Sequence, residues 1–154
     1  MIDFTSLTEE NFNNYSTFLI KEQADDQIKA LKCSKAESFA LAENGLKQLL
    51  PYGIKTTNNF FYNVCDLNKD LIIGFIWYKI NENQNKLFLY QIYVFENFRR
   101  KGYGRQIIEL LEIKAKELKV QKIEFHVFYH NSIAIDLYKK MNYNITDIIM
   151  TKNI

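Results

Sequence analysis

The most constraining feature of this sequence is a basic, glycine-containing segment, residues 95–104, which reads Phe-Glu-Asn-Phe-Arg-Arg-Lys-Gly-Tyr-Gly. Residues 86–94 before it are rich in aromatic and branched side chains, as strands prefer, and apolar residues over 107–118 recur at helical spacing. The segment therefore predicts a loop that opens a helix. The first helical turn has unsatisfied N–H groups and a partial positive charge, so Gly102 and Gly104 suit a phosphate or pyrophosphate there. A solvated loop without a ligand is an equal alternative from these residues alone.

Length and composition predict a single domain over residues 1–154. A chain of 154 residues can bury a core without metals or disulfides. Its 47% hydrophobic and 25% charged residues are ordinary for a globular protein and indicate no disorder, whereas the 15% aromatic share suggests aromatic-lined surfaces. A net charge of +2 is too small to favour nucleic acid as a partner, so the basic cluster in the loop is a local feature.

The sequence indicates neither membrane insertion nor a metal centre. No basic N-terminal segment leads into an apolar stretch, and no apolar run has the length of a membrane span, so we expect a cytoplasmic protein. Cys33 and Cys65 form no disulfide framework and are expected to be reduced and structural. His126 and His130 are the only histidines, and no local spacing joins them to other metal ligands.

Periodicity predicts the element order βααβββαβαβ. The expected strands cover residues 2–7, 60–67, 71–80, 86–95, 122–128 and 143–151. One helix is expected to begin near Thr8, and three others should cover 34–50, about 103–118 and 131–141. The three central strands should form an antiparallel meander. Because a helix joins the strands on either side of the glycine loop, those two strands should be parallel and the sheet mixed.

A second motif lies in residues 130–143, directly after a strand. Asn131 or Ser132 can cap the helix, and Ala134 and Tyr138 lie four positions apart on one side of it. A small residue one turn from a phenol is compatible with a proton donor beside a groove. The alternative is that Tyr138 is a core residue with its hydroxyl at the surface.

Together the two motifs resemble the GNAT superfamily of acyl-CoA-dependent N-acyltransferases. The family's Q/R-x-x-G-x-G/A loop corresponds to Arg99, Gly102 and Gly104, and its N-x-x-A-x-x-L-Y segment corresponds to Asn131, Ala134, Leu137 and Tyr138. The sequence departs from the pattern at Asn142, where a glycine is usual. The resemblance implies an α/β (α+β) fold: a mixed, mostly antiparallel twisted sheet of six to seven strands with helices on both faces.

The resemblance also implies that acetyl-CoA is the co-substrate and that no metal is used. Its pyrophosphate would lie on backbone N–H groups of the loop, and its pantetheine along the preceding strand, provided that a bulge splays this strand from its neighbour. The residues assigned to cofactor binding are Ile92, Tyr93, Val94, Arg99, Arg100, Lys101, Gly102, Tyr103, Gly104 and Asn131.

For catalysis, the resemblance implies that a neutral amine attacks the acetyl thioester directly. Tyr138 is the expected general acid. The alternation of the expected strand 122–128 places Glu124 and His126 on one face, and His126 is the preferred base because imidazole titrates near working pH. Glu124 and Glu96 are weaker candidates. His126 as a structural residue, with water molecules carrying the proton, is an equal alternative.

The expected function is therefore N-acetylation of a primary amine, on a small molecule or a peptide, by a monomer or homodimer. An acyl-CoA-binding sensor without turnover is the alternative, and a nucleic-acid-binding module is a third interpretation that the charge disfavours. Tyr15, Phe18 and Trp77 are candidates to line an amine pocket, but each is equally compatible with ordinary core packing.

Overall fold

The computed structural model describes all residues, 1–154, and divides them into two compact units. The first unit comprises residues 1–15 and 50–126, and the second comprises residues 16–49 and 127–154. Neither unit is continuous in sequence, because the chain passes from the first to the second inside its first helix and again after His126. The single domain expected for 1–154 stays a prediction.

The first unit is built on a five-stranded sheet in the order β1-β2-β3-β4-β5. The strands are β1 (Ile2–Ser6), β2 (Asn59–Asp66), β3 (Leu71–Asn81), β4 (Lys86–Val94) and β5 (Lys122–Phe125). Neighbours from β1 to β4 are antiparallel, whereas β5 runs parallel to β4. The predicted meander and the predicted mixed sheet are both confirmed.

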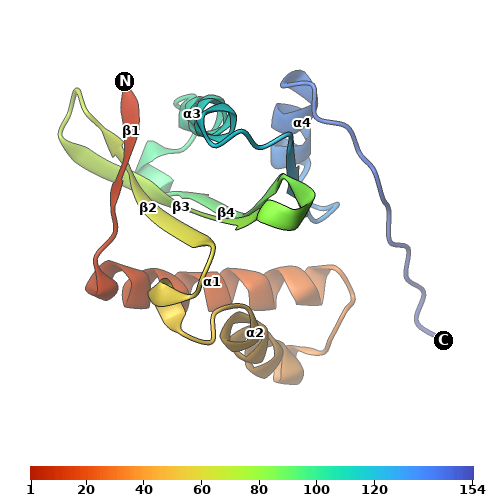
Figure 1. Cartoon of the computed structure of the whole chain (residues 1–154). Helices are drawn as coiled ribbons and strands as arrows, with labels where there is room; N and C mark the ends of the chain where they lie inside the picture. The colour runs from red at the N-terminus through yellow and green to blue at the C-terminus, as the bar shows by residue number, and fades with distance from the viewer. The chain divides into compact units, whose positions relative to one another are not determined.

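Helix α3 (Tyr103–Glu117) covers one face of this sheet (Figure 1). Its apolar stripe, Ile107, Ile108 and Leu111, has no exposed surface. Complete burial of three large aliphatic side chains contributes about 1.5–3 kcal/mol each. The helix that follows the glycine loop is therefore anchored along its length to the sheet that precedes the loop.

The opposite face carries the start of α1 (Glu9–Lys29). The ring of Tyr15 stacks on Phe75 with 4.3 Å between centroids, and its buried hydroxyl donates to Asn63 Oδ1 at 3.0 Å. Trp77 is buried on the same sheet, and its indole N–H donates to Asn59 Oδ1 at 2.8 Å. Both residues thus belong to the core, which was one of the two interpretations of their sequence positions.

β3 and β4 approach each other closely at Gly74, which pairs with Val94 at the loop end of β4. A Cβ atom built at Gly74 would collide with the backbone carbonyl oxygen of Tyr93. Only glycine permits this spacing, because backbone atoms on both sides cannot swing away as a side chain can. The path of β4 just before the loop therefore depends on a residue of the neighbouring strand.

We expect Gly74→Ala to lower the free energy of unfolding by at least about 2 kcal/mol, as overpacking against rigid atoms does. Denaturant unfolding measures the change. The matched control is Gly45→Ala, because a Cβ at Gly45 on a helix meets nothing within 4 Å. That control should be stabilising by up to about 1 kcal/mol through helix propensity. Equal stabilities for the two variants would contradict the close approach.

The second unit contains the remainder of α1, together with α2 (Lys35–Leu49) and α4 (Ser132–Lys140). The start of α1, in the first unit, is near Thr8 as predicted, and the Thr8 hydroxyl caps the helix by accepting from the Asn11 N–H at 3.1 Å. The charged stretch after Ile20 continues α1 as far as Lys29. Its place in the fold was not predictable, because a charged helical face and a charged connection have similar sequences.

The predicted strand over residues 143–151 is wrong. Beyond α4 the chain forms neither helix nor strand (Figure 1), and Ile145, Ile148 and Ile149 are exposed by 58%, 74% and 74%. Strand alternation would place Asp147 between Ile145 and Ile149 on one face, so no face of this segment is uniformly apolar. The structure has five strands where six to seven were predicted, and the order is βααβββαβα.

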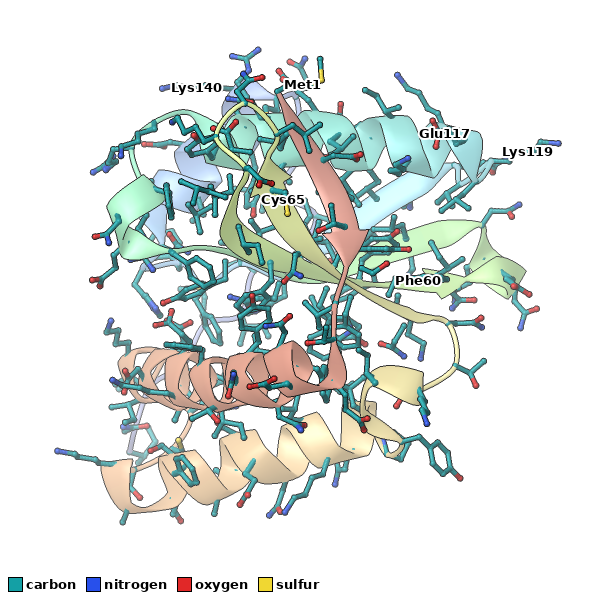
Figure 2. All side chains as sticks on the ribbon, turned by 90° about the vertical axis from the view of Figure 1, so that its left-hand side faces the viewer. Met1, Phe60, Cys65, Glu117, Lys119 and Lys140 are labelled. Carbon is teal, nitrogen blue, oxygen red and sulfur yellow. The ribbon has the colours of Figure 1, made fainter.

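Both cysteines are free. Cys65 lies on β2 beside β1 (Figure 2), and its thiol is 3.0 Å from the Thr5 hydroxyl.

None of the helices combines the length and the apolar character that a membrane-spanning segment requires.

Candidate active site

The edge of β4 opens just before the glycine loop. β5 pairs with β4 only over Lys86–Leu89, and the register with β3 shifts at Tyr90, which forms a bulge. From Tyr90 to Val94, β4 therefore has β3 on one side and no strand on the other. Backbone amide groups on that side can bind an extended chain in the manner of an added strand. The bulge on which the predicted pantetheine site depends is present.

The loop after β4 presents a row of backbone N–H groups. The short 3-10 helix η3 (Glu96–Phe98) is followed by its C-cap Arg99, and Arg100 has a φ of 63°. Gly102, with a φ of 81°, precedes α3 without a side-chain cap. The N–H groups of residues 100–105 donate no hydrogen bond within the chain. Alternating backbone conformations that align N–H groups at a helix N-terminus form an anion-binding concavity.

Two of the three basic side chains in the loop are already engaged with the protein. Arg99 Nε donates to the Val94 carbonyl at 2.8 Å, and its guanidinium lies 5.3 Å from the Tyr93 ring centroid. Lys101 Nζ donates to the Asn97 carbonyl at 2.7 Å. Arg100 is exposed. The backbone, supplemented by Arg100, thus supplies the positive end of this site.

Two of the three predicted base candidates, Glu124 and His126, lie at the end of β5 or just beyond it. The strand ends at Phe125, short of the predicted Phe128, so strand alternation does not orient His126, which is exposed in the next position. The Glu124 carboxylate is 2.7 Å from Lys86 Nζ and 3.5 Å from Lys122 Nζ. The Lys86 hydrogen bond is the main reason why the pKa of Glu124 lies below its ordinary value, which makes it a weak base. Glu96 is exposed on η3.

The second motif lies in the second unit. The predicted cap is confirmed, since the Asn131 side-chain oxygen accepts from the Ala134 N–H at 3.3 Å. Burial raises the pKa of the Tyr138 phenol to about 12, and the ring packs edge-on against Tyr143. A phenol with this pKa keeps its proton at neutral pH, so it can act as a donor.

A side-chain hydrogen bond that the sequence did not predict precedes α4. His130 Nε2 lies 2.6 Å from Asp26 Oδ1 on α1, so the segment leading into α4 is tied to a helix more than 100 positions earlier. In the sequence, Asp26 is one of several acidic residues typical of a solvated helix face. Nothing in its local sequence indicates that His130 is its partner.

Metal-ligating side chains do not gather in the structure. No group of three or more histidine, cysteine, aspartate or glutamate residues is placed to hold a metal ion.

Comparison with known proteins identifies the family. The family model of the GNAT acetyltransferases matches residues 18–143. The uncharacterized N-acetyltransferase YycN of Bacillus subtilis is 29% identical over 99% of both chains, and its crystal structure superposes with a TM-score of 0.94 over 100% of this chain and 99% of that one. The probable N-acetyltransferase san of Drosophila melanogaster is 30% identical over 74% of this chain and 71% of its own.

The chain therefore belongs to the GNAT acetyltransferase family. It is an acyltransferase of a family that uses acetyl-CoA, as the two motifs predicted. The PaiA N-acetyltransferase of Thermoplasma acidophilum, solved in complex with coenzyme A, shares the fold with a TM-score of 0.67 at 18% identity, over 97% of this chain and 93% of that one.

Proposed function

We propose that this protein transfers the acetyl group of acetyl-CoA to a primary amine by direct attack in a ternary complex. The observation that carries the proposal is the row of N–H groups over residues 100–105, reached along the open edge of β4. An anion-binding helix N-terminus joined to an unpaired strand edge suits a ligand with a diphosphate at one end and amides along its arm.

In this proposal, the main chain of the first unit binds acetyl-CoA. The N–H groups from Arg100 to Gly104 hold the diphosphate, and the exposed Arg100 is available to the remaining phosphate. Ile92, Tyr93 and Val94 lie on the open part of β4 and offer their amide groups to the pantetheine arm. Acetyl-CoA supplies the acetyl group as an activated thioester.

Proton transfer falls to two side chains. His126 takes a proton from the amine while the amine nitrogen forms a bond to the carbonyl carbon of the thioester. Tyr138 gives its proton to the sulfur as the carbon–sulfur bond breaks. The products are an N-acetyl amine and a free thiol. The Tyr138 phenol carries its proton at neutral pH and is available for this role, and the lysine-paired carboxylate of Glu124 makes it the weaker alternative as base.

An acceptor screen tests the proposal. The chain is incubated with acetyl-CoA and a panel containing a peptide N-terminus, a lysine peptide, a polyamine and a small aromatic amine. We expect acceptor-dependent thiol release, with a matching acetylated product detected by mass. Tight binding of coenzyme A without thiol release from any acceptor would favour the sensor alternative, and absence of binding would overturn both.

A further inference from the structure

Arg99 and Lys101 hold the first part of the anion-binding loop through the Val94 and Asn97 carbonyls, but these bonds do not reach the start of α3. Arg100 and Gly102 both have positive φ, α3 lacks a side-chain cap, and the N–H groups of 100–105 have no acceptor within the chain. Binding of a ligand is strongest when such groups are held in position beforehand, because the ordering entropy is then not lost on association. A contact from outside the loop that fixes the start of α3 therefore favours binding.

One loop side chain is buried, namely Tyr103 between the two glycines, with 6% of its surface exposed. Its hydroxyl donates to Asp66 Oδ2 at 2.6 Å and accepts from Lys69 Nζ at 3.0 Å. Lys69 Nζ is also 3.5 Å from Asp66 Oδ2. Both hydrogen-bonding functions of the phenol are thus used: Asp66 is the last residue of β2, and Lys69 lies in the turn that joins β2 to β3.

Asp66 is a rigid anchor. Its backbone pairs with Ile2 on β1 and with Leu71 on β3, so strands on both sides fix it. Its other carboxylate oxygen accepts from the Asn68 N–H at 3.0 Å. The carboxylate is buried, and bonds from three donors hold it in its charged form; the Tyr103 hydroxyl is the main reason that its pKa is lowered.

We propose that Asp66 and Lys69 are positioning residues for coenzyme A binding, acting through the Tyr103 hydroxyl to hold the N–H groups at the start of α3. The inference rests on the proposed function, since it concerns the same diphosphate site. Asp66 and Lys69 make no contact with the ligand in this role. Lys69 also balances the negative charge of Asp66 near a site that must attract an anion.

The primary test is calorimetry with coenzyme A on two variants, Tyr103→Phe and Asp66→Asn. Each should weaken binding about tenfold, the equivalent of one charge-assisted hydrogen bond. The double variant should be little weaker than either one, because both remove the same interaction. Lys69→Arg, which keeps a cationic donor, should bind nearly as the wild type does, whereas Lys69→Met should not.

Tyr15→Phe is the matched control, since it removes a buried tyrosine hydrogen bond from the core of the same unit. Its affinity for coenzyme A should equal that of the wild type. An equal loss of affinity in this control and in Tyr103→Phe would show a general effect of stability and overturn the positioning role. Tyr103→Phe deletes a single oxygen atom, so it keeps the test available should Asp66→Asn fail to fold.

Limited proteolysis measures how readily the loop opens in the absence of a ligand. Trypsin cleaves after Arg99, Arg100 and Lys101, and we expect several-fold faster cleavage at these bonds in Tyr103→Phe than in the wild type or Tyr15→Phe. Wild-type cleavage rates and wild-type coenzyme A affinity in folded Tyr103→Phe would overturn the inference alone. Failure of the wild-type chain to bind coenzyme A would instead overturn the proposed function, whatever the proteolysis shows.

Discussion

Replacing Tyr138 by phenylalanine should lower turnover roughly 100-fold and leave the affinity for acetyl-CoA unchanged, because proton donation to a leaving group contributes about this factor. The phenol is protonated throughout the neutral range, because burial raises its pKa to about 12. Phenylalanine keeps the ring and its edge-on packing against Tyr143, so only the hydroxyl is lost.

Steady-state kinetics with a saturating acceptor measure the effect, and calorimetry with coenzyme A provides the binding control. Tyr143→Phe is a comparison variant from the same aromatic pair, and it should lose far less turnover. Wild-type turnover in Tyr138→Phe would remove this residue from the chemistry. A parallel loss of coenzyme A affinity would assign it to binding instead.

The second large effect is expected at Gly104, the second residue of α3. A leucine there would project a branched side chain beside the N–H groups of the first helical turn and prevent close approach of a diphosphate. We expect Gly104→Leu to weaken coenzyme A binding at least about 100-fold, a loss of about 2.7 kcal/mol. The variant should fold, because Gly104 does not have a positive φ and leucine favours helix.

Gly45→Leu on α2 is the matched control, since it makes the same change at a helical glycine where a Cβ meets nothing within 4 Å. Coenzyme A affinity in this control should equal that of the wild type, with unfolding midpoints measured for both variants. Retained binding in folded Gly104→Leu would contradict the assignment of the loop.

Sequence reasoning succeeded wherever the determining signal is local. The strand, glycine loop and helix around Gly102 are consecutive in the chain, and the Thr8 and Asn131 caps each depend on residues three positions away. The antiparallel meander followed from short turns between strand-like runs. Such features are predictable because neighbours along the chain decide them.

Structural features that depend on a distant part of the chain were not predictable from local sequence patterns. The segment after Tyr143 has apolar residues typical of a strand, yet no strand pairs with it. The bulge at Tyr90 depends on the register between β3 and β4, and the bond between Asp66 and Tyr103 joins residues 37 positions apart. No local pattern distinguishes Asp66 from any other aspartate at the end of a strand.

The construction of the loop also has a consequence for how its importance can be measured. Its binding groups over residues 100–105 are main-chain N–H groups, which every residue except proline possesses. Alanine scanning would therefore leave most of this surface intact and detect little at loop positions other than Arg100, which offers a side chain to a phosphate, and Gly102, which has a positive φ. Such a scan would also identify Tyr103 and its two partners, Asp66 and Lys69, whose side chains hold that backbone in place.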